Sequence, residues 1–161
     1  MPKFTKKKAK TPVFSEGFTQ SRAAYKQVHA HLSKHLGKHP NFDYSMSEFH
    51  PDHTLSLLDE DTQRVLAFCT VNPSLKKTLN KKGTKPEYLQ IGIMEVIDST
   101  QRRKGLGSRM LAELVDIARK GGFKCVRTFA IDGAAGFYRK FGFVTDLSMV
   151  EREMNVRFDV V

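Results

Sequence analysis

The sequence has few of the features that mark secreted, membrane-spanning or disulfide-rich proteins. Its 161 residues include two cysteines, Cys69 and Cys125. Both lie in apolar surroundings, so we expect buried, reduced thiols. No apolar run approaches the roughly 18 residues of a membrane span, and no apolar stretch follows the basic N-terminus as it does in a secretory signal. We therefore expect a cytoplasmic protein that makes no membrane contact.

Acidic residues are scarce as well. There are 17 Asp and Glu against 27 Lys and Arg, which gives a formal net charge of +10 and an isoelectric point of about 9.7. Such an excess favours anionic partners, such as nucleotides, RNA, DNA or acidic protein surfaces. The length and the hydrophobic content of 40% are those of a soluble domain with a sizeable core.

Metal-binding patterns are also missing. His31 and His35 stand at i and i+4 of a predicted helix, but Leu32 follows His31 where an H-E-x-x-H zinc site requires glutamate. The other four of the six histidines show no ligand spacing. We therefore expect surface histidines and no metal site.

The chain divides into a basic arm and one domain. Residues 1–17 hold five lysines and two prolines with little to bury, which predicts a flexible arm before a single domain over 18–161. Periodicity predicts helices over 21–36, 106–119 and 134–141, and strands over 53–58, 64–71, 88–97 and 125–131. Residues 72–86 are predicted to form a lysine-rich connection. The unit 88–131 should pair in parallel and the preceding hairpin antiparallel, which gives a mixed sheet with helices on both faces.

The most informative segment is the basic turn Arg102-Arg-Lys-Gly-Leu-Gly107, between a predicted strand and a predicted helix. A helix N-terminus binds anions through free backbone N–H groups, and glycines let a phosphate approach closely. The turn lacks the lysine that follows the glycine in a Walker P-loop, and Met110 replaces the third glycine of a dinucleotide fingerprint. The pattern therefore indicates a phosphate site of another kind.

A second segment, Ala135-Gly-Phe-Tyr-Arg-Lys-Phe-Gly-Phe143, follows the next predicted strand. Together the two segments resemble the [QR]-x-x-G-x-[GA] and A-x-x-F-Y-x-x-x-G-F motifs of the GNAT superfamily of acetyl-CoA-dependent N-acetyltransferases. Their order, spacing and flanking elements agree over residues 53–143. The resemblance implies an α+β (mixed α/β) fold, in which helices flank a central, splayed, mixed sheet. It also implies direct acetyl transfer from acetyl-CoA to an amine in a ternary complex.

The resemblance implies roles for individual residues. One loop would bind the CoA pyrophosphate at the positive end of the helix dipole, through Arg102, Arg103, Lys104, Gly105, Leu106, Gly107 and Ser108. The pantetheine arm would pair like a strand with the backbone of Glu95, Val96 and Ile97, because the family separates strand 88–97 from strand 125–131. Lys104, Arg139 and Lys140 are alternatives for contact with the adenosine phosphates.

Tyr138 matches the family's tyrosine that protonates the departing CoA thiolate. The base is open. Glu95 is the only ionisable side chain in the central part of its apolar strand, so it either accepts the proton, directly or through water, or turns toward solvent or a basic neighbour. Many relatives carry an asparagine near CoA where this chain has Ile131, and the adjacent Asp132 would cap helix 134–141 instead.

Two classes of function remain. The first is an N-acetyltransferase whose basic surface favours an acidic or nucleic-acid-associated acceptor, such as a ribosomal or nucleoid protein or an aminoacyl-tRNA. The second is a nucleic-acid-binding module that kept the scaffold with little or no transferase activity, and that binds through the lysines of 3–10 and 76–85. Another acyl group would leave the same motifs, and a monomer and a homodimer are both compatible with the sequence.

Overall fold

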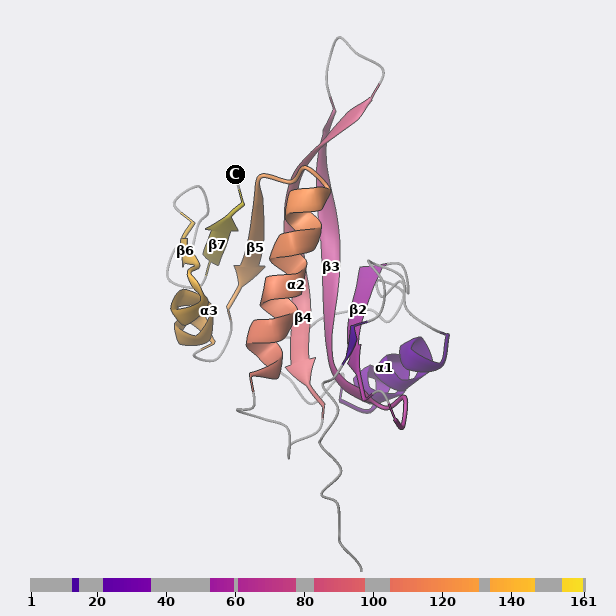
Figure 1. Cartoon of the computed structure of the whole chain (residues 1–161). Coiled ribbons are helices and arrows are strands. Elements are labelled where there is room, and N and C mark those ends of the chain that lie inside the picture. Colours follow the sequence, from indigo (N-terminus) through magenta and orange to yellow (C-terminus); the bar gives the residue numbers. More distant parts are fainter. Residues whose placement is uncertain are drawn as a thin grey trace, which may run out of the picture.

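The computed structural model describes residues 13–14, 22–35, 53–59, 61–77, 83–97, 105–130, 134–146 and 155–160. Within these ranges seven strands form one sheet, in the order β1-β2-β3-β4-β5-β7-β6 (Figure 1). The strands are β1 (Val13–Phe14), β2 (Thr54–Leu58), β3 (Val65–Lys77), β4 (Thr84–Val96), β5 (Cys125–Phe129), β6 (Val144–Thr145) and β7 (Asn155–Asp159). The helices are α1 (Arg22–His35), α2 (Leu106–Lys120) and α3 (Ala135–Phe141).

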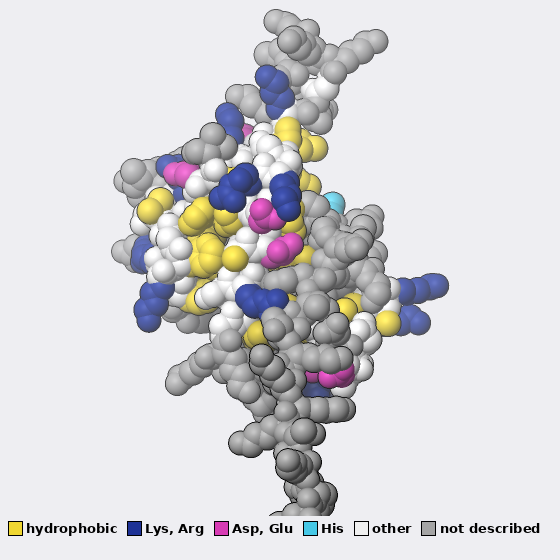
Figure 2. All heavy atoms as spheres, in the orientation of Figure 1, with side chains coloured by type: hydrophobic (Ala, Val, Ile, Leu, Met, Phe, Trp, Pro, Cys, Tyr) yellow, Lys and Arg dark blue, Asp and Glu magenta, His cyan; other side chains and the backbone are white. Residues whose placement is uncertain are grey.

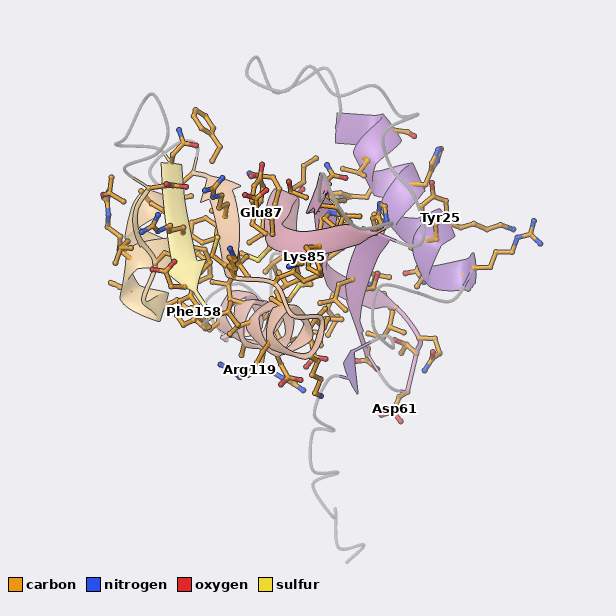
Figure 3. The ribbon with its side chains drawn as sticks, turned by 90° about the horizontal axis from the view of Figure 1, so that it is seen from above. Tyr25, Asp61, Lys85, Glu87, Arg119 and Phe158 are labelled. Atoms are coloured by element: carbon orange, nitrogen blue, oxygen red, sulfur yellow. The ribbon has the colours of Figure 1, made fainter. Side chains whose placement is uncertain are left out.

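Helices cover both faces of the sheet, as predicted. Tyr25 on α1 and Arg119 on α2 lie on opposite sides of the strands (Figure 3). The larger hydrophobic core lies between the sheet and the helices α2 and α3, and a smaller core lies between α1 and the strands β2 and β3. Strands β4 and β5 are parallel, whereas β2, β3 and β4 are antiparallel neighbours. The predicted mixed sheet is therefore confirmed.

Helix α2 follows directly from its sequence. Its six buried residues are the six that helical spacing predicts for the core: Leu106, Met110, Leu111, Leu114, Val115 and Ala118. The helix ends at Gly121, whose N–H donates to the carbonyl of Ile117 at 2.9 Å, and Gly122 follows with a φ of 76°. A left-handed residue after a helix favours glycine because it has no Cβ.

The β3–β4 hairpin is longer than predicted. Strand β3 continues to Lys77 and β4 begins at Thr84, so most of the expected connection over 72–86 is strand. The hairpin projects beyond the other strands (Figure 1). Its outer part is held by backbone pairing, which extends to Lys77 opposite Thr84. Hydrophobic alternation does not report pairing of this kind, because the projecting strands have no core to face.

The N-terminal arm contains a short strand that the sequence did not indicate. Val13 and Phe14 pair antiparallel with Leu58 and Leu57 of β2. The other residues of the predicted arm lie outside the described ranges.

Both cysteines are buried and free, as expected. Burial raises the pKa of the Cys69 thiol well above its ordinary value. Among the helices in the described ranges, none is both long enough and apolar enough to cross a bilayer.

Candidate active site

The site begins where β4 separates from β5. The two strands pair in parallel from Tyr88 opposite Cys125 to Ile91 opposite Thr128. Beyond Ile91, β4 continues to Val96, and within the described ranges no strand pairs with it on this side. The backbone groups along this edge can therefore pair with an extended ligand, as an added strand would.

A β-bulge lies at the point of separation. The β3–β4 register shifts between Cys69 and Val71, so Gly92 and Ile93 together face the single residue Thr70. The Ile93 N–H donates to the Thr70 hydroxyl oxygen at 2.9 Å. A Cβ on Gly92 would lie 2.7 Å from that same oxygen, closer than a carbon can approach. Thus the bulge requires glycine, and a glycine inside an apolar strand was its only sequence signal.

The open edge of β4 presents alternate residues. The N–H of Ile97 donates to the Leu66 carbonyl at 2.8 Å, so this N–H faces β3. Successive backbone groups of a strand point to opposite edges. It follows that Val96 presents its backbone to the gap, whereas Glu95 and Ile97 direct theirs to β3. Of the three residues predicted to pair with pantetheine, Val96 is thus the one whose backbone groups face the gap.

The N-terminus of α2 lies beside this gap. Gly105 precedes the helix with a φ of 79°, a left-handed conformation that favours glycine. The first N–H groups of a helix have no partner within it, and in α2 no described side chain caps them and no acid stands in the first turn. A Cβ on Gly107 would lie 2.9 Å from the Phe137 ring. The close packing of Gly107 on Phe137 explains physically why the two sequence motifs occur together.

A cavity of about 450 Å³ joins these parts, a size typical of ligand sites. Seven predicted site residues line it: Glu95, Val96, Gly105, Leu106, Gly107, Ser108 and Tyr138. Five residues that were not among the predicted site residues complete the lining: Ala67, Met94, Met110, Ala134 and Phe137. Of the remaining predicted residues, Ile97, Arg139 and Lys140 are absent from the lining. Arg102, Arg103, Lys104, Ile131 and Asp132 lie outside the described residues.

Tyr138 is the buried titratable group of this cavity. Its side chain is 6% exposed, and its ring packs against those of Phe137 and Phe143, each with a centroid distance of 5.2 Å. Burial, with a smaller contribution from the charge of Cys69, raises the pKa of Tyr138 to about 12, and a hydrogen bond with Thr128 acts in the opposite direction. At neutral pH the phenol is therefore protonated, which is the form of a proton donor.

Glu95 turns its side chain away from α2. Met94 and Val96 pack against the core under α2, whereas Ile93 and Ile97 pack against the core under α1. Glu95 lies between Met94 and Val96, and because successive side chains of a strand point to opposite faces, its side chain faces α1.

The Glu95 carboxylate oxygen Oε1 lies 3.1 Å from Nε2 of His31 on α1. The prediction of a surface histidine is wrong for His31, whose side chain is 14% exposed, because α1 buries it against Phe68. Among the described residues there is no group of three or more metal-ligand side chains.

A buried ion-pair cluster stabilises the strands on the far side of the gap. Asp146 is 1% exposed and contacts Nε of Arg127 at 2.9 Å and Nη1 of Arg157 at 3.5 Å. The Arg127 guanidinium also lies over the Tyr88 ring, 4.2 Å from its centroid. These contacts tie β5 to β4 and β7 close to the point of separation. The sequence carried no signal for them.

Comparisons with known proteins agree with this geometry. The profile of the Acetyltransferase (GNAT) family matches residues 19–143. The NatC complex bound to Gag peptide and CoA is 14% identical with a TM-score of 0.65, covering 94% of this chain and 100% of that chain. The GNAT family N-acetyltransferase YhbS from Escherichia coli, in complex with CoA, is 14% identical with a TM-score of 0.62, covering 93% and 82%.

AtaT complexed with acetyl-methionyl-tRNAfMet is 17% identical with a TM-score of 0.55, covering 88% of this chain and 84% of that chain. At such identities the likeness shows the fold alone. No curated protein gives a significant match. Because the family profile covers most of the chain, and because both motifs meet at one cavity, the chain belongs to the Acetyltransferase (GNAT) family and is an N-acetyltransferase with acetyl-CoA as its co-substrate.

Proposed function

We propose that the protein transfers the acetyl group directly to an amine in a ternary complex, with Tyr138 as general acid and Glu95 as general base. One observation carries this proposal. The N-terminus of α2, the open edge of β4 and the protonated Tyr138 all border the same cavity. The first can bind a pyrophosphate, the second an extended pantetheine arm, and the third a leaving sulfur.

The chemistry needs one base and one acid. The acceptor nitrogen gives a proton to the Glu95 carboxylate and forms a bond to the acetyl carbonyl carbon. The carbon–sulfur bond breaks as the Tyr138 hydroxyl passes its proton to the departing sulfur. Solvent then reprotonates Tyr138 and takes the proton from Glu95. The products are an acetylated amine and free CoA.

The raised pKa of Tyr138 limits how it acts. A thiol has a pKa of roughly 8.5, below the value of about 12 for Tyr138. Complete proton transfer to a free thiolate would therefore be uphill. Tyr138 stabilises the sulfur by donating its proton as charge develops during cleavage, so its contribution falls on kcat.

The charges around Glu95 support an anionic acceptor. Glu95 faces α1, whose residues Arg22, Lys26 and Lys34 are exposed and which contains no acidic residue. Arg22, Tyr25, Lys26 and His29 line a hollow of about 340 Å³ on this helix. On the face that carries α2, basic and acidic side chains both lie among hydrophobic ones (Figure 2). We therefore propose an acidic or nucleic-acid-associated protein, or an aminoacyl-tRNA, as the acceptor.

A nucleic-acid-binding role is the second candidate, and the projecting hairpin favours it. Lys85 of this hairpin is exposed, and its positive charge can pair with a phosphate of a nucleic acid. Structures of the same fold include AtaT with acetyl-methionyl-tRNAfMet and a KacTA–DNA complex. Binding of this kind would weaken steeply with added salt.

The test combines binding with acetyl transfer. Calorimetry measures the Kd for acetyl-CoA, and labelled acetyl-CoA is incubated with a cell lysate, whose protein, RNA and small-molecule fractions are then counted. Protease or nuclease treatment of the labelled fraction identifies the class of acceptor. A matched assay with propionyl-CoA tests the choice of acyl group.

The matched variants are Tyr138→Phe and Tyr88→Phe. We expect Tyr138→Phe to lower transfer by about 100-fold or more, the usual contribution of a general acid, with the Kd for acetyl-CoA nearly unchanged. Tyr88→Phe keeps the ring under Arg127 and should leave both quantities unchanged. If the wild-type protein bound RNA in a salt-dependent manner and transferred no label, the second candidate would replace the first.

A further inference from the structure

Helix α1 is fixed on the sheet beside the site. Ala24, Val28 and Leu32 are buried at spacings of four residues and pack with Phe68 of β3. On the same face, the Gln27 side chain accepts from the Val65 N–H at 2.8 Å and donates to the Gln63 carbonyl at 3.0 Å. Because residues before and after His31 in the sequence are held by these contacts, the backbone at His31 has little freedom to move.

The imidazole of His31 is held as well. Its ring lies edge-on to Phe68 with a centroid distance of 5.9 Å and an interplanar angle of 69°. The side chain is 14% exposed, against 35% for Glu95, so the pair meets solvent mainly through the carboxylate. Nε2 of His31 lies 3.1 Å from Oε1 of Glu95, which is within the distance of an ion pair.

The pair stands at the end of β4 that borders the cavity. Glu95 lines the cavity together with Tyr138, but its carboxylate lies on the side of the sheet that α1 covers. An acceptor amine that enters the gap from the α1 side would therefore meet this carboxylate first. A base is commonly oriented by a third group that binds its far side, and His31 has that relation to Glu95.

We propose that His31 is the positioning residue for Glu95, holding Oε1 so that Oε2 is directed to the acceptor amine. This inference rests on the proposed role of Glu95 as base. His31 acts on turnover through the orientation of the carboxylate and makes no contact with acetyl-CoA. Its effect therefore falls on kcat and leaves the affinity for acetyl-CoA unchanged.

The experiment uses the full-length chain with saturating acetyl-CoA and two amine probes, glycinamide and a lysine-containing peptide. His31→Gln keeps a donor that reaches Glu95, His31→Asn has a donor one methylene shorter, and His31→Leu has none. Ala30→Leu is the matched control, because Ala30 is an exposed residue next to His31 on the same helix. Circular dichroism shows whether each variant is folded. If His31→Leu is unfolded, the inference is judged from the kcat of His31→Gln and His31→Asn.

We expect His31→Leu and His31→Asn to lower kcat at least about tenfold, a part of the hundredfold or more that a positioned base supplies. His31→Gln should retain at least a third of wild-type kcat, and the Kd for acetyl-CoA should stay within twofold throughout. In a Glu95→Gln background, His31→Leu should cause no further loss, because both changes remove one function.

Wild-type kcat in His31→Leu would overturn the inference, as would equal losses in the Gln and Asn variants or independent losses in the double variant. Those results leave the proposed function standing, because the wild-type enzyme still transfers acetyl groups. A wild-type protein that acetylates neither probe and no lysate fraction would overturn both proposals.

Discussion

Replacing Gly92 by alanine should close the gap that the site requires. The new Cβ would lie 2.7 Å from Oγ1 of Thr70 and 3.7 Å from the Thr70 carbonyl oxygen. Only the first contact is a clash, and Thr70 is buried with its hydroxyl engaged by the Ile93 N–H. We expect the free energy of unfolding to fall by about 1–3 kcal/mol, the usual cost of overpacking.

A double-mutant cycle separates the clash from the hydrogen bond. Thr70→Ala removes the hydroxyl that satisfies the Ile93 N–H, which should cost about 1–3 kcal/mol for the unpaired donor. In the Thr70→Ala background the clash with Oγ1 no longer exists. The double variant should therefore lose less unfolding free energy than the two single variants lose together, and the difference should be about 1–3 kcal/mol.

The assay is urea unfolding followed by circular dichroism, because the chain has no tryptophan for fluorescence. The Kd for acetyl-CoA is measured on the same proteins and should rise at least tenfold in Gly92→Ala, since a regular β4 would continue to pair with β5. Gly83→Ala is the control, as an added Cβ there has no neighbour within 4 Å. Strictly additive losses of stability, or an unchanged Kd in Gly92→Ala, would refute this account of the bulge.

Three further predictions concern the same region. Burial holds the pKa of Tyr138 at about 12 against 10 in the unfolded chain, so the folded state retains its proton longer and loses stability as pH rises from about 10 to 12. The loss relative to Tyr138→Phe should reach about 3 kcal/mol, and a constant difference between the two proteins in alkaline unfolding titrations would count against it. Asp146→Ala should cost about 1–3 kcal/mol, because the half-buried guanidinium groups of Arg127 and Arg157 lose their carboxylate. The surface variant Asp116→Ala, which loses the exposed pair with Lys120, should unfold at nearly the same urea concentration as the wild type. Gly105→Ala should cost about 1–2 kcal/mol, because its φ of 79° strains any residue with a Cβ, and equal melting curves would exclude that strain.

Local features of the fold were predictable. Every residue expected on the buried face of α2 is buried, and the two glycine-containing motifs come together at one cavity. A helix with a hydrophobic repeat, or a turn with glycine, can be predicted from a few neighbouring residues, because it does not depend on contacts with distant parts of the chain. Among the described residues, the predicted phosphate loop keeps Gly105 to Ser108 as cavity lining.

Features that depend on pairing were not predictable. The continuation of β3 to Lys77, the short strand at Val13 and the bulge at Gly92 are set by the backbone of another strand. The same holds for Ile97, whose N–H donates to β3 instead of the gap. A backbone hydrogen bond carries no side-chain signature, so hydrophobic periodicity does not record it.

The sequence by itself determined the class of fold, the helix that follows the basic turn, and the motif that contains Tyr138, because each is encoded in residues close along the chain. Only the tertiary structure decided the direction of Glu95. In the strand pattern this residue could face either side, and it is helix α1, more than sixty residues earlier, that brings His31 to 3.1 Å from its carboxylate. Contact across such a separation depends on how helix and sheet pack, and no local pattern in the chain contains that information.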